Sequence, residues 1–236
     1  MKQNDFVFFM RSVICNFENN NNHGTAHIYK NSLNSFITFC HSSTIPFRKI
    51  TPELLKGFEA YLRQKQRSWN TVSTYLRALR ATYNRAVDKH LAPYIPRLFK
   101  QVYTGTRADR KKALNIKDMS RILHSWDTDE IPHGLFILMF MLRGLPFVDL
   151  VNLHKKDLNG NIITYRRRKT GKQLIVEVPQ EALTILEKYM DTNPHSPYLF
   201  PFLTHREGTA EAYHEYQWTL RIFNQQLSLL TKALQL

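Results

Sequence analysis

Helical periodicity in the first hundred or so residues is the feature that most limits the fold of this chain. Apolar side chains recur there at spacings of three and four, as they do on helices that bury one face. Pro52 after Thr51 marks a strong helix start, because proline lacks the amide hydrogen that would be unpaired at that place. The pattern predicts helices from Asp5 to Phe17, from a cap at Thr25 to about Cys40, from Thr51 onward, and from Ser68 or Asn70 to about His90.

The second part of the chain combines helices with one convincing β signal. β-branched residues at Ile162–Tyr165 and Leu174–Val178 flank a turn at Thr170-Gly171-Lys172, which is typical of a hairpin. Helices are predicted around it from Asn115 to about Trp126, at Ile131–Met141, from Pro146 to about Leu153, at Gln180–Met190, and from about Glu211 to the C-terminus. We therefore expect a mainly α fold: a helical domain over 1–100, a basic linker over 101–113, and a second, α+β domain over 114–236 with a small antiparallel sheet.

The charge balance indicates the kind of partner. Lys and Arg number 33 against 19 Asp and Glu, a formal net charge of +14, which favours an anionic partner and most often nucleic acid. Two cysteines cannot form a disulfide framework, so a reducing cytosol is expected. The longest apolar run, Leu135–Leu142, is too short to span a membrane, and we expect no membrane partner.

A polar stripe shares the fourth predicted helix with its apolar stripe. Arginines there can neutralise phosphates, while asparagine and serine can hydrogen-bond to backbone oxygens or base edges. An ordinary solvated helix face would have the same pattern. The candidate DNA-binding residues on this helix are Asn70, Ser73, Arg77, Arg80 and Asn84.

Two further basic clusters are candidates for phosphate contact. The linker carries Arg107, Arg110, Lys111 and Lys112, which would equally suit a flexible charged hinge. The hairpin carries Arg166, Arg167, Arg168 and Lys169 in succession, with Lys172 beyond the turn. Like charges that alternate along a strand do not pair with one another, so a nearby polyanion explains them better than pairing does. Lys169 could protonate a leaving oxygen or stabilise the charge on a phosphorane. A solvated hairpin tip would carry the same residues.

Other kinds of chemistry find no support in the sequence. The histidines have no metal-ligand spacing, and there is no phosphate-binding glycine loop or G-x-S-x-G motif. Acidic residues are scarce and dispersed, which argues against a two-metal nuclease centre. We expect neither a metal nor a cofactor.

Five segments of the chain stand in a characteristic order and spacing. They are Tyr29-x-x-x-Leu33-x-x-Phe36, the helix Asn70–Ala86, Arg143-Gly144-Leu145-Pro146-Phe147-Val148-Asp149-Leu150, Tyr165-Arg166-Arg167-Arg168-Lys169-Thr170-Gly171, and Tyr198-Leu199-Phe200-Pro201. Together they resemble the phage-type integrases, that is, the tyrosine recombinases, and are most similar to integrases of Bacteroidetes mobile elements.

The resemblance implies a helical core-binding (SAM-like) domain and a tyrosine-recombinase catalytic domain that together clamp double-stranded DNA. In that family a tyrosine attacks a phosphodiester without metal or nucleotide. Lys169 matches the family's hairpin lysine, which protonates the leaving 5′ oxygen, and Asp149 matches the acid near the first arginine. The family's first arginine falls at Pro146, so Arg143 is the displaced candidate for that role.

The resemblance also implies that the catalytic set is incomplete in these residues. The His-x-x-Arg motif and the nucleophilic tyrosine are missing, and Tyr213 and Tyr216 lie upstream of where those motifs begin. We therefore expect a DNA-binding fragment or truncated member, in the bacterial cytoplasm at the nucleoid, that does not cleave DNA alone. The alternatives are a homo-oligomer or recombinase partner chain that completes catalysis, and an interaction module that dimerises through an exposed stripe on the last helix (Leu220, Phe223, Leu227 and Leu230).

Overall fold

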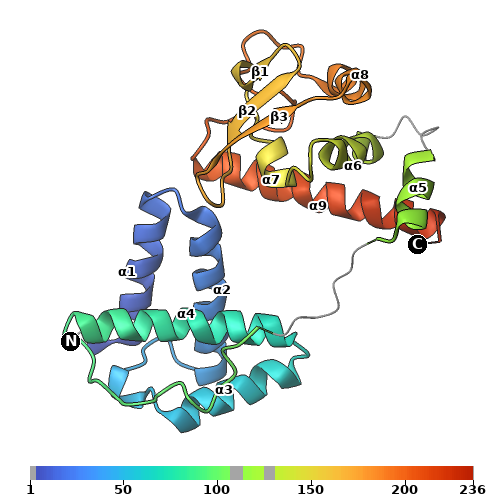
Figure 1. Cartoon of the computed structure of the whole chain (residues 1–236). Helices are drawn as coiled ribbons and strands as arrows, with labels where there is room; N and C mark the ends of the chain where they lie inside the picture. Colours follow the sequence, from blue (N-terminus) through green and yellow to red (C-terminus); the bar gives the residue numbers. More distant parts are fainter. Residues whose placement is uncertain (1–3, 107–113, 125–130, 236) are drawn as a thin grey trace. The chain divides into compact units, whose positions relative to one another are not determined.

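The structure, a computed structural model, describes residues 4–106, 114–124 and 131–235. The chain divides into two compact units, Met1–Lys111 and Lys112–Leu236 (Figure 1). Each unit has its own cluster of buried apolar side chains. The two units are therefore described separately. No helix among the described residues is both long and apolar enough to cross a membrane.

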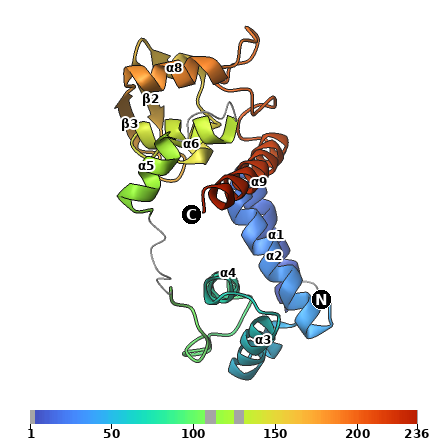
Figure 2. The same cartoon turned by 90° about the vertical axis from the view of Figure 1, so that its right-hand side faces the viewer.

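The first unit is helical, as predicted. Its elements are α1 (Phe6–Asn19), α2 (His23–Cys40), the short 3-10 helix η2 (Phe47–Lys49), α3 (Pro52–Gln64) and α4 (Trp69–Asp88). α1 and α2 lie side by side and α4 crosses them (Figure 1), while Figure 2 looks nearly along α4 with α3 beside it.

Side-chain caps explain where two of these helices begin. Thr51 and Ser68 each accept a hydrogen bond from an amide three residues later, at the starts of α3 and α4. The predicted cap at Thr25 is wrong, because α2 already begins at His23. The amide of Ala26 donates to the carbonyl of Asn22 at 3.0 Å, so backbone hydrogen bonding extends the helix past Thr25 without a side-chain cap.

Aromatic rings hold the first unit together. Phe36 is fully buried, and its ring centroid lies 5.9 Å from that of Phe6 and 5.0 Å from that of Phe58, both edge to face. Phe47 makes the same kind of contact with Tyr83 on α4 at 5.9 Å. Such pairs add about 0.5–1.5 kcal/mol each to the burial of their area, so this cluster joins the helices of the unit.

The linker begins later than the predicted range 101–113. Val102 is buried in the core of the first unit, and the amide of Tyr103 donates to the buried carboxylate of Glu59 on α3. A segment that buries side chains and is hydrogen-bonded to a core helix belongs to the folded unit. The remainder of the predicted linker, 107–113, lies outside the described residues.

The second unit combines helices with a small sheet. Its elements are α5 (Ile116–His124), α6 (Ile131–Met141), α7 (Phe147–Leu150), the 3-10 helix η3 (Lys155–Asp157), β1 (Leu158–Asn159), β2 (Ile162–Arg166), β3 (Gln173–Glu177), α8 (Gln180–Tyr189) and α9 (Ala210–Ala233). The sheet is antiparallel in the order β1-β2-β3. The predicted fold class, mainly α with a small antiparallel sheet, is confirmed. The strand β1 was not predicted, because two residues are too few to show an alternating pattern.

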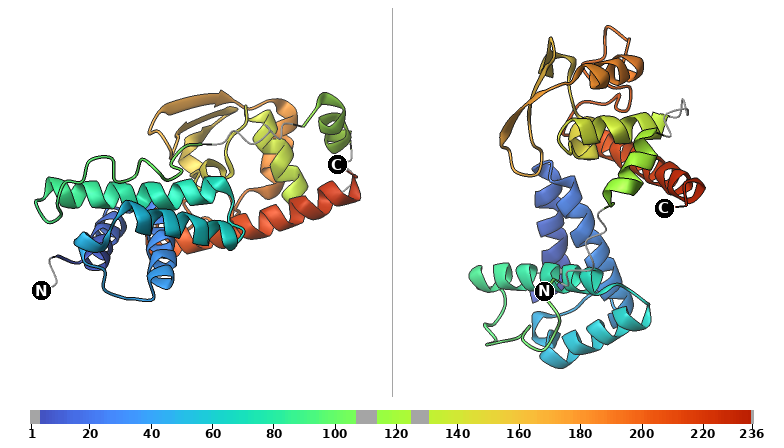
Figure 3. Two further views of the ribbon diagram at one scale, coloured as in Figure 1. Left: turned by 90° about the horizontal axis from the view of Figure 1, so that it is seen from below. Right: turned by 45° about the vertical axis from the view of Figure 1, so that its right-hand side comes forward.

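The alternation of side chains along the strands determines which face of the hairpin is buried. Ile163 pairs with Val176 and Tyr165 pairs with Leu174, and the side chains of Ile163, Tyr165 and Val176 are buried. The residues between them point to the opposite face. The hairpin loop extends beyond the sheet (Figure 3).

The last helix, α9, buries more of its apolar stripe against its own unit than was predicted. Phe223 is buried, and its ring stacks on Phe147 with centroids 4.4 Å apart, while Leu220 and Leu227 pack against the same core. α6 and α9 run side by side (Figure 1), so α9 finds its apolar partners within the unit. The prediction that this stripe is exposed is therefore wrong for its central residues.

Phe36→Ala should destabilise the first unit by about 3–5 kcal/mol, because it leaves a cavity where rings from three elements meet. Urea unfolding followed by circular dichroism measures the change. Phe8→Ala removes a ring that is 48% exposed on α1 and should cost much less. Equal losses for both variants would contradict the description of the core.

Candidate nucleic-acid interface

Two clefts meet on the surface of α4 in the first unit. One, of about 530 Å³, lies between α2 and α4, and the other, of about 610 Å³, lies between α4 and residues 94–104. Arg80 and Asn84 line both clefts. The cationic side chains around the two clefts are Arg77, Arg80, Arg97 and Lys100. A helix face with this lining suits a phosphate backbone.

Most of the predicted polar stripe lies on this surface. Arg77 and Asn84 are exposed there, and the half-buried Arg80 donates from Nη1 to the Thr104 hydroxyl at 3.3 Å. Asn70 is exposed on α4 but lines neither cleft. Ser73 is only 2% exposed, and its hydroxyl has no hydrogen-bond partner among the described residues.

Ser73 is therefore corrected from a DNA-facing residue to a core residue. α4 packs against α1, α2 and α3, so its buried face is wider than one apolar stripe and also takes in small and polar residues such as Ala78 and Thr82. The linker candidates Arg107, Arg110, Lys111 and Lys112 lie outside the described residues.

A buried carboxylate anchors the basic hairpin of the second unit. Asp149 on α7 is 2% exposed, and its Oδ1 accepts a hydrogen bond from the amide of Arg168 at 3.0 Å. The Nε of Arg167 lies 4.0 Å from Oδ2 of the same carboxylate. The turn is closed by a hydrogen bond from the amide of Arg167 to the carbonyl of Lys172 at 2.9 Å. Gly171 has φ +67°, a conformation that favours glycine.

The basic side chains of the hairpin are directed to solvent. Arg166, Arg167, Arg168 and Lys169 are all exposed. Lys169 has no hydrogen bond or ion pair with any described residue. It is therefore available to an incoming anion, and its catalytic role stays a prediction.

Arg143 lies in the loop that ends α6, not on a helix. Arg143 and Gly144 both have positive φ, +59° and +74°, and the amides of Gly144 and Leu145 donate to the carbonyl of Met139 at 3.0 Å. The exposed guanidinium of Arg143 makes no hydrogen bond or ion pair with the part of the chain that the structure describes. Its role as the displaced arginine stays a prediction.

A cluster of three side chains beside the hairpin had no signal in the sequence. The carboxylate of Glu207 accepts a hydrogen bond from Arg168 Nη1, and its Oε2 lies 3.7 Å from Nε2 of His154. The His154 ring packs against Tyr198 with centroids 5.2 Å apart. These residues border a cleft of about 400 Å³ that Lys156, Arg166 and Gln173 also line. Glu207 is 39 residues from Arg168, so only the tertiary fold brings them together.

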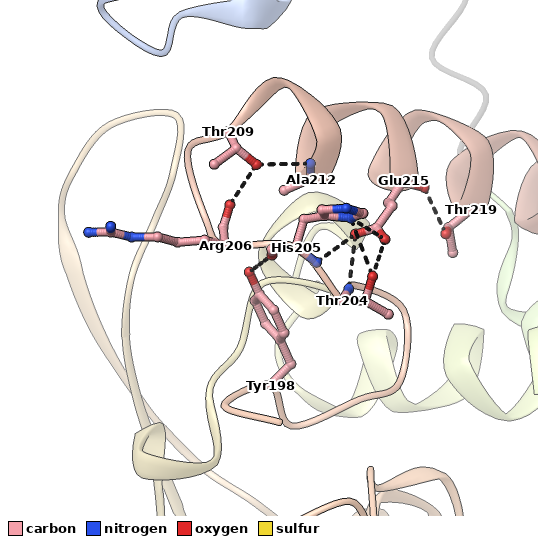
Figure 4. A network of polar contacts seen from close by, with 8 residues as sticks. All are labelled: Tyr198, Thr204, His205, Arg206, Thr209, Ala212, Glu215 and Thr219. Carbon is pink, nitrogen blue, oxygen red and sulfur yellow. Dashed lines mark hydrogen bonds and ion pairs between the residues drawn. The ribbon is translucent and has the colours of Figure 1, made fainter. Parts of the chain in front are cut away.

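The loop that carries Glu207 is fastened to α9 (Figure 4). The Glu215 carboxylate accepts hydrogen bonds from the amide and hydroxyl of Thr204, and from the amide of His205 at 3.1 Å and its Nδ1 at 2.8 Å. Burial raises the pKa of Glu215, but the hydrogen bonds from Thr204 and His205 outweigh it and lower that pKa to about 2. The Tyr198 hydroxyl holds the other side by donating to the carbonyl of His205 at 2.6 Å.

The described residues contain no group of three or more His, Cys, Asp or Glu side chains placed to hold a metal ion. The side chains at the hairpin offer positive charge, hydrogen bonding and proton transfer.

Comparisons with known proteins find similarity to integrases and tyrosine recombinases. Residues 5–100 match the family described as the phage integrase SAM-like domain. The tyrosine recombinase XerD of Listeria monocytogenes serotype 4b is 31% identical over 143 residues, which are 57% of this chain and 46% of that protein. The chain thus spans about half the length of this curated relative.

Solved structures of low sequence identity share the fold. The Tn1549 transposon integrase in complex with transposon right end DNA superposes with a TM-score of 0.62 at 13% identity, covering 90% of this chain and 75% of that one. A lambda integrase tetramer bound to a Holliday junction gives a TM-score of 0.56 at 13% identity, covering 70% of this chain and 48% of that one. The expected similarity to Bacteroidetes elements stays a prediction.

The Glu215 network should make the stability of the second unit depend on acid pH. Because the folded pKa is lowered to about 2, the stabilisation is complete above the unfolded pKa near 4.5 and is lost as the pH falls toward 2. Glu215→Gln should remove most of this dependence, as measured by thermal unfolding between pH 6 and about 3. Glu187→Gln, an exposed change on α8, is the control. An unchanged pH profile in Glu215→Gln would contradict the assignment.

Proposed function

The chain belongs to the tyrosine recombinase family, and from that premise we propose that it binds double-stranded DNA in site-specific integration or recombination. The observation that carries the proposal is the row of four exposed cations at Arg166–Lys169, held on a turn that the buried Asp149 anchors. Fixed positive charge of this kind recognises phosphates. The DNA present in the solved structures of the Tn1549 and lambda integrases supports the same partner.

Each unit contributes a separate basic surface to this proposal. In the first unit, Arg77 and Arg80 contact phosphates and Asn84 adds hydrogen bonds to the backbone or to base edges. In the second unit, the hairpin arginines bind phosphate oxygens, and Lys169 would donate a proton to the leaving 5′ oxygen only where a partner chain supplies the attacking tyrosine. The predicted linker cations extend the same contact. A protein that binds DNA in this way works at the nucleoid of a bacterial cell, and this is the location we propose for the chain.

A second candidate function is catalysis that a partner chain completes. The side chains of Arg143 and Lys169 favour it, because both are exposed and neither is paired with a described residue, which leaves them available to a scissile phosphate. Burial raises the pKa of the Tyr213 and Tyr216 hydroxyls, which disfavours the nucleophilic phenolate, and we assign neither as nucleophile. The tetramer of lambda integrase supports an assembly of this kind, with copies of the chain or with another recombinase as the partner.

Duplex binding should weaken steeply with salt, because phosphate neutralisation releases counterions. Fluorescence anisotropy with a labelled duplex between 50 and 200 mM salt measures the slope of log affinity against log salt, at about 0.9 per phosphate contact. Arg77→Gln should lower the slope by about 0.9. Lys65→Gln removes the same charge from an exposed position outside both clefts and should leave the slope almost unchanged. A flat salt dependence in the unaltered chain would exclude phosphate neutralisation.

The 236-residue chain alone should form no covalent adduct with a nicked suicide duplex, because no assigned nucleophile is present. Denaturing gel electrophoresis detects such an adduct. Adding a partner that supplies the His-x-x-Arg motif and a tyrosine should produce one, and Lys169→Ala in this chain should then slow its formation by about 100-fold or more. An adduct formed by the chain alone and abolished by Tyr213→Phe or Tyr216→Phe would overturn the assignment.

A further inference from the structure

We propose that His154 and Arg168 form a phosphate-binding site that the side chain of Glu207 fills until DNA displaces it. The inference rests on the proposed DNA-binding function and adds a binding residue, His154, together with an internal competitor, Glu207. Neither was a candidate from the sequence.

Two cationic or hydrogen-donating side chains converge on one carboxylate. Arg168 Nη1 donates to Oε1 of Glu207, while Nε2 of His154 lies 3.7 Å from Oε2. Carboxylate and phosphate oxygens accept from a guanidinium in the same planar geometry. Glu207 therefore stands where two phosphate oxygens would be bound.

The donors are held in place by contacts that do not involve Glu207. The backbone of Arg168 is fixed by its amide hydrogen bond to Asp149 at 3.0 Å. The ring of His154 packs on Tyr198, and the His154 amide donates to Asp157 Oδ2 at 2.9 Å. A site whose donors are already oriented loses little conformational entropy when it binds an anion.

Glu207 differs from the other acids that line the cleft. Asp149 and Asp157 each accept a hydrogen bond from a backbone amide, so their carboxylates are committed to the fold. Within the part of the chain that the structure describes, the hydrogen bond and ion pairs of the Glu207 carboxylate are made only with the side chains of Arg168 and His154. It can therefore rotate away without breaking a backbone hydrogen bond.

The loop under Glu207 stays in place when its side chain moves. His205 is held by Tyr198 and Glu215, and the Thr209 hydroxyl accepts from the amide of Ala212 to cap α9 (Figure 4). Between these anchors Gly208 has φ +87°, which only glycine adopts without strain. The Glu207–Arg168 pair is also open to solvent, since its side chains are 44% and 35% exposed. Exchange of carboxylate for phosphate thus requires a side-chain rotation only.

The proposal predicts that removing the competitor strengthens DNA binding through Arg168. Glu207→Gln should tighten duplex binding by about threefold more than Glu187→Gln, which removes an equal charge from an exposed position on α8. In an Arg168→Gln background, the two glutamate changes should have equal effects. Fluorescence anisotropy at one fixed salt concentration measures all of these affinities, and thermal unfolding confirms that each variant is folded.

An equal effect of Glu207→Gln and Glu187→Gln in the unaltered background would overturn the proposal while leaving DNA binding intact. The proposal would also be overturned if Glu207→Gln tightened duplex binding as much in the Arg168→Gln background as in the unaltered background. When His154→Ala is added to the Glu207→Gln protein, its affinity for duplex DNA should fall about twofold or more. No loss in that double variant would remove His154 from the site.

Inorganic phosphate tests the site without DNA. In nitrogen-15 NMR spectra, phosphate should shift the Arg168 Nε–H resonance of Glu207→Gln at several-fold lower concentration than that of the unaltered protein. If the chain fails to bind duplex DNA but this shift occurs, the anion site stands and the proposed function falls. If phosphate shifts the resonance equally in both proteins, or in neither, the role of Glu207 as competitor is wrong.

Discussion

The hydrogen bond from the Arg168 amide to the buried Asp149 carboxylate is the interaction on which the second unit's surface depends. A carboxylate that is 2% exposed is costly unless hydrogen bonds and nearby positive charge compensate its lost hydration. Here a backbone amide of the hairpin supplies one hydrogen bond and the Arg167 guanidinium supplies charge at 4.0 Å. The same hydrogen bond therefore offsets part of the cost of burying Asp149 and fixes the position of the basic turn. Without it, four adjacent cations on a loop would repel one another and have no defined direction.

The two units present positive charge by different physical means. On α4 the helical period alone places Arg77, Arg80 and Asn84 on one surface, and the aromatic core beneath the helix keeps it in place. On the hairpin, residues far apart in the chain set the positions: Asp149 holds the turn, and Glu207 holds the side chain of Arg168. The first arrangement is local and stiff. The second has an exchangeable contact, which is what a site needs if it is to bind an anion only when one of the right geometry arrives.

Local sequence signals predicted well wherever one backbone rule dominates. The observed bounds of α6, Ile131–Met141, are those predicted for the segment that contains most of the apolar run Leu135–Leu142. Thr51 and Ser68 cap α3 and α4 because their hydroxyls satisfy unpaired amides. The error at Ser73 came from tertiary packing. Ser73 fits the polar stripe by spacing, yet three neighbouring helices widen the buried face of α4 to include it.

Periodicity, turn chemistry and composition were enough to predict the helical first unit, the basic hairpin and the net positive charge, and five ordered motifs carried the resemblance to the tyrosine recombinases. The fold was needed to show that Phe223 is covered by Phe147, that Val102 belongs to the first core, and that Glu207 meets Arg168 and His154. Those contacts join residues distant along the chain. Their partners are selected by the packing of whole elements, which no local spacing of side chains encodes.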